Sequence, residues 1–330
     1  MILDEILLDN ISNIAGIKTA PKNLEEIFCF FKNLKEKLET GDYKSELIAL
    51  VFFNFLTKKE IRDRKVTSRI FEDIMAKLFK GTVLDEESKE NFPAPDYIKK
   101  YDDKHINSCK KFNFLISNDL STNKREKADN KFGNYTLSLK TLKGQLYDSN
   151  LNIIDKDINN ELNIGSLSYR ALLVDLLSDE ELSKLSDRKG GLGSKKQLIK
   201  QIYTPLEKNS KWTDFINRLN DFLNYIYDGS DFIIVFKSGY KMKILFIKEK
   251  DFIDELINIA KTDYSTFFDI FYRWENNNLR IHYNKLFKVL KEKSKIKEIE
   301  LNFNTLEKSI PLQEKINKIK FSIENILLKD

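Results

Sequence analysis

Three polar residues in the segment 126–141 have the types and spacing needed for chemistry on a phosphate. Gly133-Asn134 predicts a two-residue turn between two β-rich runs. An antiparallel hairpin closed by this turn places Asp129 directly opposite Ser138, with their Cβ atoms about 4.5–5.5 Å apart. Lys140 then lies one diagonal step away, within about 7–8 Å of Asp129. The pattern therefore predicts that a carboxylate, a hydroxyl and an amine converge on one face of the hairpin.

This cluster suits the hydrolysis of a phosphodiester. Leu137 and Leu139 alternate with the polar residues and point to the opposite face, toward a core. A carboxylate can hold Mg²⁺ through oxygen ligation, and a bound metal lowers the pKa of its water. A lysine can orient that water or stabilise the charged transition state. The alternative is a half-exposed hairpin in which Asp129 and Lys140 form a surface pair worth about 0–1 kcal/mol.

The segment resembles the core motif of the PD-(D/E)XK nuclease superfamily, particularly the type II restriction endonucleases. Their motif comprises a helix with a glutamate, a strand with an Asp, a short turn, and a strand that ends in acid-X-Lys. Asp129 matches the metal-binding Asp, Lys140 matches the catalytic Lys, and Glu72 lies in the expected helix, 67–79. The resemblance covers residues 67–141 and implies Mg²⁺ as the cofactor.

Two positions depart from that motif. Ala128 replaces the Pro of the PD pair, a common change in the family, and Ser138 stands at the acidic position. A hydroxyl is neutral and is a weaker metal ligand than a carboxylate. If the site is catalytic, Glu72 or alternatively Glu126 should supply the second carboxylate, with Asp129, Glu72 and Ser138 around the metal. If neither reaches the site, two alternatives are left: a single carboxylate that binds metal too weakly, or a hairpin that is the relic of a metal site.

Basic and aromatic residues outside the hairpin are candidates for DNA contact. The stretch 187–196 is rich in glycine and lysine but lacks the spacing of a P-loop. Backbone amides and lysines here could grip a phosphate, or the stretch could be a connector before a helix. A second basic and aromatic group, 272–283, surrounds a predicted hairpin turn. The candidate DNA-binding residues are Gln145, Tyr169, Arg170, Arg188, Lys189, Ser194, Lys195, Lys196, Arg273 and Arg280.

The elements that must position these residues follow from the hydrophobic period. The first 80 residues are predicted to be helical, and the helix 67–79 is expected to be capped by Thr67-Ser68 and ended by Gly81. Ser178 and Glu181 fit a capping box, whereas 148–164 is expected to be a connection. The remaining predictions are helices at 166–177, 213–227 and 250–261, hairpins formed by 232–236 with 242–247 and by 268–274 with 279–283, and a strand at 298–303.

Composition limits the classes of protein. The 330 residues carry 56 Lys and Arg against 51 Asp and Glu, so a net charge of +5 excludes a polycation and requires any DNA surface to be local. Two cysteines and two histidines exclude a disulfide framework and a histidine-rich metal site. The N-terminus lacks the bases of a signal peptide and the longest apolar stretch is too short to span a bilayer, so we expect a cytoplasmic protein.

We therefore expect an α/β (α+β) fold in which helices flank a central mixed sheet. The expected divisions are a helical N-terminal region (1–66), a catalytic core (67–230), and C-terminal hairpins and helices (231–330). The resemblance implies a Mg²⁺-dependent, sequence-specific double-stranded DNA endonuclease that acts as a homodimer, with a methyltransferase encoded nearby. The alternatives are a non-catalytic DNA-binding or protein-binding module with a degenerate nuclease fold, and another nuclease of this superfamily, such as an antiphage or repair enzyme.

Overall fold

The computed structural model describes most of the chain. The described residues are 2–57, 64–84, 128–142, 161–163, 172–185, 194–238, 241–275 and 278–303, with single positions at 100, 103, 104, 107, 110 and 111. The described helices are α1 (Ile2–Asp9), α2 (Ile11–Ile14), α3 (Leu24–Glu39), α4 (Tyr43–Thr57), α5 (Arg64–Leu78), α8 (Asp179–Ser183), α9 (Lys195–Leu198), the π-helix η2 (Ile199–Tyr203), α10 (Thr204–Lys208), α11 (Trp212–Tyr227), α12 (Glu249–Thr262), α13 (Tyr264–Ile270) and α14 (Tyr283–Glu292).

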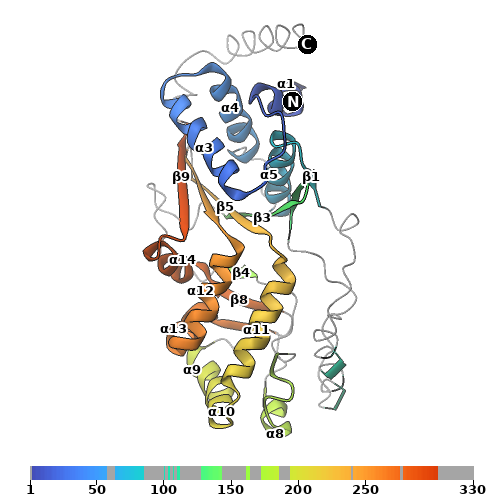
Figure 1. The fold of residues 1–330 in the computed structure, drawn as a ribbon, viewed down its shortest axis with the longest axis vertical. Coiled ribbons are helices and arrows are strands. Elements are labelled where there is room, and N and C mark those ends of the chain that lie inside the picture. Colours follow the sequence, from blue (N-terminus) through green and yellow to red (C-terminus); the bar gives the residue numbers. More distant parts are fainter. Residues whose placement is uncertain are drawn as a thin grey trace.

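A six-stranded mixed sheet lies at the centre of the molecule, in the order β1-β2-β3-β5-β6-β9 (Figure 1). Its strands are β1 (Thr82–Val83), β2 (Asn130–Phe132), β3 (Tyr135–Leu142), β5 (Asp231–Ser238), β6 (Lys241–Ile247) and β9 (Ile296–Asn302). Neighbouring strands are antiparallel except β3 and β5, which are parallel. A parallel pair needs a long crossover connection, and α11 lies in the chain between these two strands. This confirms the expected mixed sheet flanked by helices.

Each face of the sheet is buried under its own set of helices. Leu137 and Leu139 belong to a core shared with α3, α4 and α5, which also contains Ile233 from β5. Alternate residues of β5, such as Phe232 and Ile234, belong to a second core with α11 and α12. Because Ser138 and Lys140 pair with Phe232 and Ile234, these two polar residues share the α11 face.

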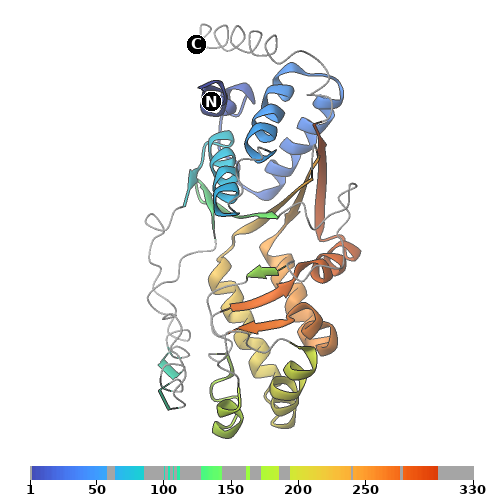
Figure 2. The same ribbon diagram turned by 180° about the vertical axis from the view of Figure 1, so that it is seen from behind.

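A smaller three-stranded sheet completes the α11 side. It has the order β4-β8-β7, formed by Glu161–Asn163, Asn278–His282 and Arg273–Glu275, and lies in front of α11 and α12 in Figure 2. Trp274 and Ile281 are fully buried in the same core as Phe232. The Trp274 ring stacks on Phe215 of α11 with centroids 5.7 Å apart. The small sheet therefore packs on the side of the main sheet that carries Ser138 and Lys140.

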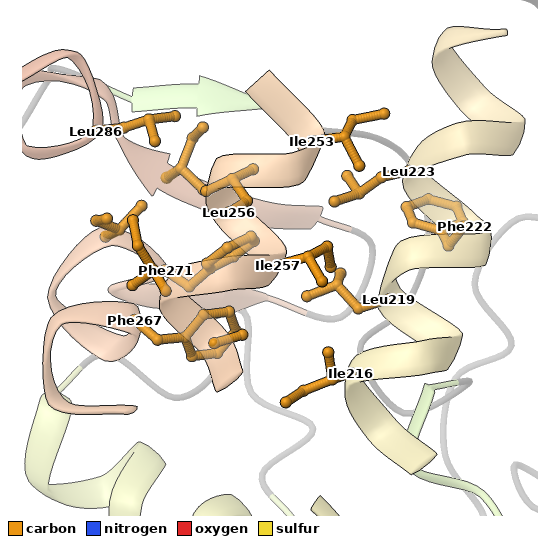
Figure 3. Close-up of a cluster of buried hydrophobic side chains, with 14 of the residues drawn as sticks. Ile216, Leu219, Phe222, Leu223, Ile253, Leu256, Ile257, Phe267, Phe271 and Leu286 are labelled. Atoms are coloured by element: carbon orange, nitrogen blue, oxygen red, sulfur yellow. The ribbon is translucent and has the colours of Figure 1, made fainter. Parts of the chain in front are cut away.

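The packing between α11 and α12 follows their amphipathic sequences (Figure 3). Ile216, Leu219 and Leu223 recur at helical spacing on α11 and meet Ile253 and Ile257 of α12. All five side chains are buried. Burial of a side chain of this size contributes about 1.5–3 kcal/mol, so this interface anchors the helix that leads into β5.

Several elements predicted from periodicity are confirmed. The predicted helices 213–227 and 250–261 correspond to α11 and α12, the hairpin 232–236 with 242–247 to β5 and β6, and the strand 298–303 to β9. The Ser178 side chain and Glu181 form the expected capping box. Most of the expected helix 166–177 lies outside the described residues, as do the Gly-rich stretch before Ser194 and the residues after 303.

Three local predictions were wrong. The run 268–274 is not a strand, because Asp263 caps α13 by accepting from Thr266 N, and only 273–275 is extended. The helix expected at 67–79 is already formed at Arg64, so Thr67-Ser68 lies inside α5 and is not its cap. Its end at Leu78 lies one residue before the predicted end. The connection expected at 148–164 contains β4.

The expected division at 230/231 falls inside the main sheet, since β5 pairs with β3 along its length. The third predicted segment therefore completes the same sheet as the second. Within the described residues, no helix is both long and apolar enough to cross a bilayer.

Candidate functional site

The hairpin register agrees with the sequence prediction. Phe132 pairs with Tyr135, Lys131 with Thr136 and Asn130 with Leu137. Gly133 has a φ of 61° whereas Asn134 does not adopt a positive φ, the pattern of a type II′ turn. This turn fixes the register and hence brings Asp129, just before β2, to Ser138 and Lys140.

One oxygen of the Asp129 carboxylate collects three donors. Oδ2 accepts from the backbone N–H of Leu139 at 2.6 Å, from Lys140 Nζ at 2.8 Å and from Ser138 Oγ at 3.3 Å. The second oxygen, Oδ1, accepts no hydrogen bond from any of the residues described. Ser138 is fully buried, while the side chains of Asp129 and Lys140 keep 18% and 29% of their surface exposed. The predicted cluster is therefore assembled, and its charged members remain accessible to solvent.

Just before β2, the Asp129 carboxylate takes the place of a backbone carbonyl as the acceptor of a hydrogen bond from β3. Asp129 N donates to Leu137 O at 2.7 Å, and Leu84 N donates to Asp129 O at 2.9 Å, which holds the backbone on both sides. The Leu139 N–H, which would continue the ladder, donates to the Asp129 side chain instead. The carboxylate is thus fixed by the backbone of β3 rather than by flexible side chains alone.

The helix α5 positions β2 from the opposite face of the sheet. Asn130 Nδ2 donates to the backbone oxygen of Glu72 at 2.9 Å, and Asn130 is fully buried. Gly81, in the connection from α5 to β1, permits this connection to approach β2 closely, because a Cβ there would lie 2.3 Å from the Phe132 ring and 2.6 Å from Lys131 O. Residue 72 therefore lies next to Asn130, the residue that follows Asp129 in the chain. That the Glu72 carboxylate shares a metal with Asp129 stays a prediction, and Glu126 lies outside the described residues.

Tyr227 is a neighbour of the site that the sequence did not indicate. It is the last residue of α11 and is buried, and its ring packs edge-on against Phe232, the β5 partner of Ser138, with centroids 4.8 Å apart. Burial, the charge of Asp129 and that of Glu249 raise the pKa of the Tyr227 hydroxyl. Tyr227 is therefore a neutral residue close enough to Asp129 to sense its charge.

A second group of acids surrounds the turn between α11 and β5. Asp231 accepts from Tyr135 Oη at 2.9 Å and from Glu249 N at 2.8 Å. Burial raises the pKa of both Asp231 and Glu249, and the charge of Asp231 raises that of Glu249 further. Ser230 Oγ and Thr136 Oγ1 share a hydrogen bond of 2.8 Å. These contacts join the turn to the start of β3, the strand that carries Ser138 and Lys140.

The oxygen atoms at this site fit a Mg²⁺ ion for which the protein supplies only some of the ligands. Mg²⁺ is usually bound through one or two carboxylates together with waters and substrate phosphates. Asp129 supplies one carboxylate, and the Leu139 carbonyl, which accepts from Lys140 Nζ at 3.1 Å, is a nearby oxygen. The described part of the chain contains no group of three His, Cys, Asp or Glu that could enclose a metal ion. Ser138 donates to Asp129 and so orients this carboxylate.

The predicted DNA-binding residues fall into three groups: those whose side chains the structure describes, those of which it describes the backbone alone, and those outside the described residues. Ser194 caps α9 by accepting from Gln197 N, as a residue at a helix start should. Lys195 bonds to Asp269 at 2.7 Å and to Ser265 at 2.8 Å, whereas Lys196 is exposed. Of Arg273 and Arg280 only the backbone is described, and the two are cross-strand partners in the small sheet. Gln145, Tyr169, Arg170, Arg188 and Lys189 lie outside the described residues.

Comparison with known proteins yields no matching family model, no matching curated protein and no matching solved structure. A function can therefore be inferred from the motif and from the geometry of Asp129, Ser138 and Lys140.

Proposed function

We propose that this chain is a Mg²⁺-dependent, sequence-specific endonuclease that hydrolyses phosphodiester bonds of double-stranded DNA, of the type II restriction class. The observation that supports the proposal most is the contact of Lys140 Nζ with Asp129 at the end of a hairpin whose register follows from its turn. The elements also follow the order that the PD-(D/E)XK resemblance implies. This order is a helix, a segment with an Asp, a turn, and a strand with Ser-Leu-Lys.

The roles proposed for the residues follow from their chemistry. Asp129, with its Oδ1 not hydrogen-bonded by the described residues, would hold the metal, and Glu72 is the candidate second carboxylate. When bound, Mg²⁺ would lower the pKa of an attacking water and neutralise charge on the phosphate. Lys140 would place its positive charge beside the reacting phosphate, and Ser138 would orient Asp129. The proposed enzyme acts as a homodimer, because cutting both strands of a palindrome calls for two related sites.

A second candidate is a DNA-binding protein of the same fold that has lost catalysis. Ser138 at the acidic position favours this candidate, because it leaves Asp129 as the one carboxylate among the three residues brought together. A third candidate, another nuclease of the superfamily such as an antiphage or repair enzyme, differs in substrate rather than in the site.

Digestion of a defined plasmid in Mg²⁺, and separately in Mn²⁺, distinguishes the three. The first proposal predicts discrete fragments of fixed size. Ragged degradation, or preference for single strands, would support the third candidate. Tight DNA binding without cleavage in either metal would contradict the first and support the second.

A further inference from the structure

In the free protein, the Asp129 carboxylate is already in contact with a cation, the ammonium group of Lys140. The 2.8 Å ion pair ends on Oδ2, the same oxygen that accepts from Leu139 N and Ser138 Oγ. A divalent ion on this carboxylate would lie close to the ammonium group, and the two positive charges would repel each other.

We propose that Lys140 and a divalent cation compete for Asp129, so that Lys140 moves off the carboxylate as the cation binds. This inference rests on the proposed function, because it takes Asp129 as the metal ligand. The phosphate of a bound DNA strand is the anion to which Lys140 would turn. Cation and DNA should consequently bind cooperatively, each raising the affinity of the protein for the other.

Of the three donors to Asp129, two are held in place and the third is free to reorient. The Leu139 N–H belongs to the backbone of β3, and Ser138 is fully buried beside Phe232. Both therefore keep the carboxylate oriented when Lys140 leaves. Lys140 retains 29% of its side-chain surface in solvent and has a flexible four-carbon stem, so it is the group free to reorient.

Titration of the free protein with Mn²⁺, with unbound Mn²⁺ followed by electron paramagnetic resonance, tests the competition. An ion pair that solvent reaches is worth up to about 1 kcal/mol, so we expect Lys140→Met to bind Mn²⁺ about fivefold more tightly than wild type. Lys140→Arg, which keeps the charge, and Lys131→Ala, at an exposed position on the same hairpin, should bind like wild type within about twofold. Asp129→Asn should lose the site.

Equal or weaker Mn²⁺ binding by Lys140→Met would overturn the inference, as would no measurable binding by wild type and Lys140→Met alike. Thermal unfolding checks that each variant is folded, and Lys140→Gln replaces Lys140→Met if that variant is not. A duplex oligonucleotide that stays uncut should tighten Mn²⁺ binding by wild type more than by Lys140→Met. The Mn²⁺ titration needs no cleavage, so the two proposals can fail separately. Tighter Mn²⁺ binding by Lys140→Met without DNA cleavage by wild type would reject the proposed function alone. DNA cleavage by wild type without tighter Mn²⁺ binding by Lys140→Met would reject the inference alone.

Discussion

At the scale of single residues, the site depends on how one carboxylate is held. Asp129 receives a backbone N–H, a buried hydroxyl and an ammonium group on a single oxygen. The sequence was sufficient to predict this convergence, because a two-residue turn fixes which residues face each other. It could not predict Tyr227, since that contact depends on how α11 packs against β5, about 90 residues beyond the hairpin.

Lys140→Met should lower the cleavage rate by about 100-fold or more, because it removes the positive charge proposed to stabilise the transition state. Lys131→Ala is the matched control, since Lys131 is exposed on the same hairpin and pairs with Thr136. Single-turnover cleavage with excess enzyme gives both rates. An unchanged rate for Lys140→Met, or an equal loss in both variants, would argue against a catalytic role for Lys140.

At the scale of elements, the site needs α5 packed tightly on β2. Gly81 adjoins the Phe132 ring and the carbonyl of Lys131. Gly81→Ala should therefore destabilise the fold by about 1–3 kcal/mol, as an overpacked side chain does, and should reduce activity by displacing the strand beside Asp129. Urea unfolding measures the change in free energy. A variant as stable as wild type would contradict this description of the contact between β2 and the connection from α5 to β1.

A buried carboxylate joins α12 to the connection between α14 and β9. Glu255 is 2% exposed and pairs with Lys293 and, at 3.3 Å, with Lys295. Its hydrogen bonds to charged groups should make Glu255→Gln less stable by about 1–2 kcal/mol, a value reduced because both lysines reach solvent. Glu292→Gln, an exposed acid at the end of α14, serves as the comparison in chemical denaturation, and an equal effect in the two would reject a special role for Glu255.

The elements also mark where local sequence was insufficient. The aromatic-rich run 268–274 has the composition of a strand, but the cap from Asp263 to Thr266 starts a helix that includes the first part of this run. The parallel pairing of β3 with β5 is absent from any local pattern, because it joins strands separated by about 90 residues. The capping box at Ser178 and the helix α11, by contrast, depend on neighbours in sequence and were predicted correctly.

At the scale of the whole molecule, the nearly balanced net charge includes partly buried acids that make the stability of the fold depend on pH. Asp231 and Glu249 lie at the junction of α11, β5 and α12, and burial raises the pKa of each. An acid whose pKa is higher in the folded state stabilises the fold below its unfolded pKa, near 4, and loses that contribution as the pH rises through its folded pKa.

Glu249→Gln removes one of these groups while its amide oxygen can still accept from Gly229 N. The stability of the variant relative to wild type should therefore improve as the pH rises from about 4 to 8, since wild type alone must ionise a half-buried carboxyl. Urea unfolding across this range gives the two curves. A constant difference between them would show that the pKa of Glu249 is not raised in the folded protein.

The central claim, that Asp129 is the metal-binding carboxylate of a nuclease, is tested most directly by the plasmid-cleavage rate of Asp129→Asn in Mg²⁺. This change keeps the size of the side chain and removes the charge. Asp228→Asn is the matched control, because Asp228 is exposed at the end of α11 in a left-handed conformation that Asn tolerates. With this role for Asp129, we expect discrete fragments from wild type and Asp228→Asn at similar rates, and at least about 100-fold slower cleavage by Asp129→Asn. Cleavage by Asp129→Asn at the wild-type rate would contradict this role.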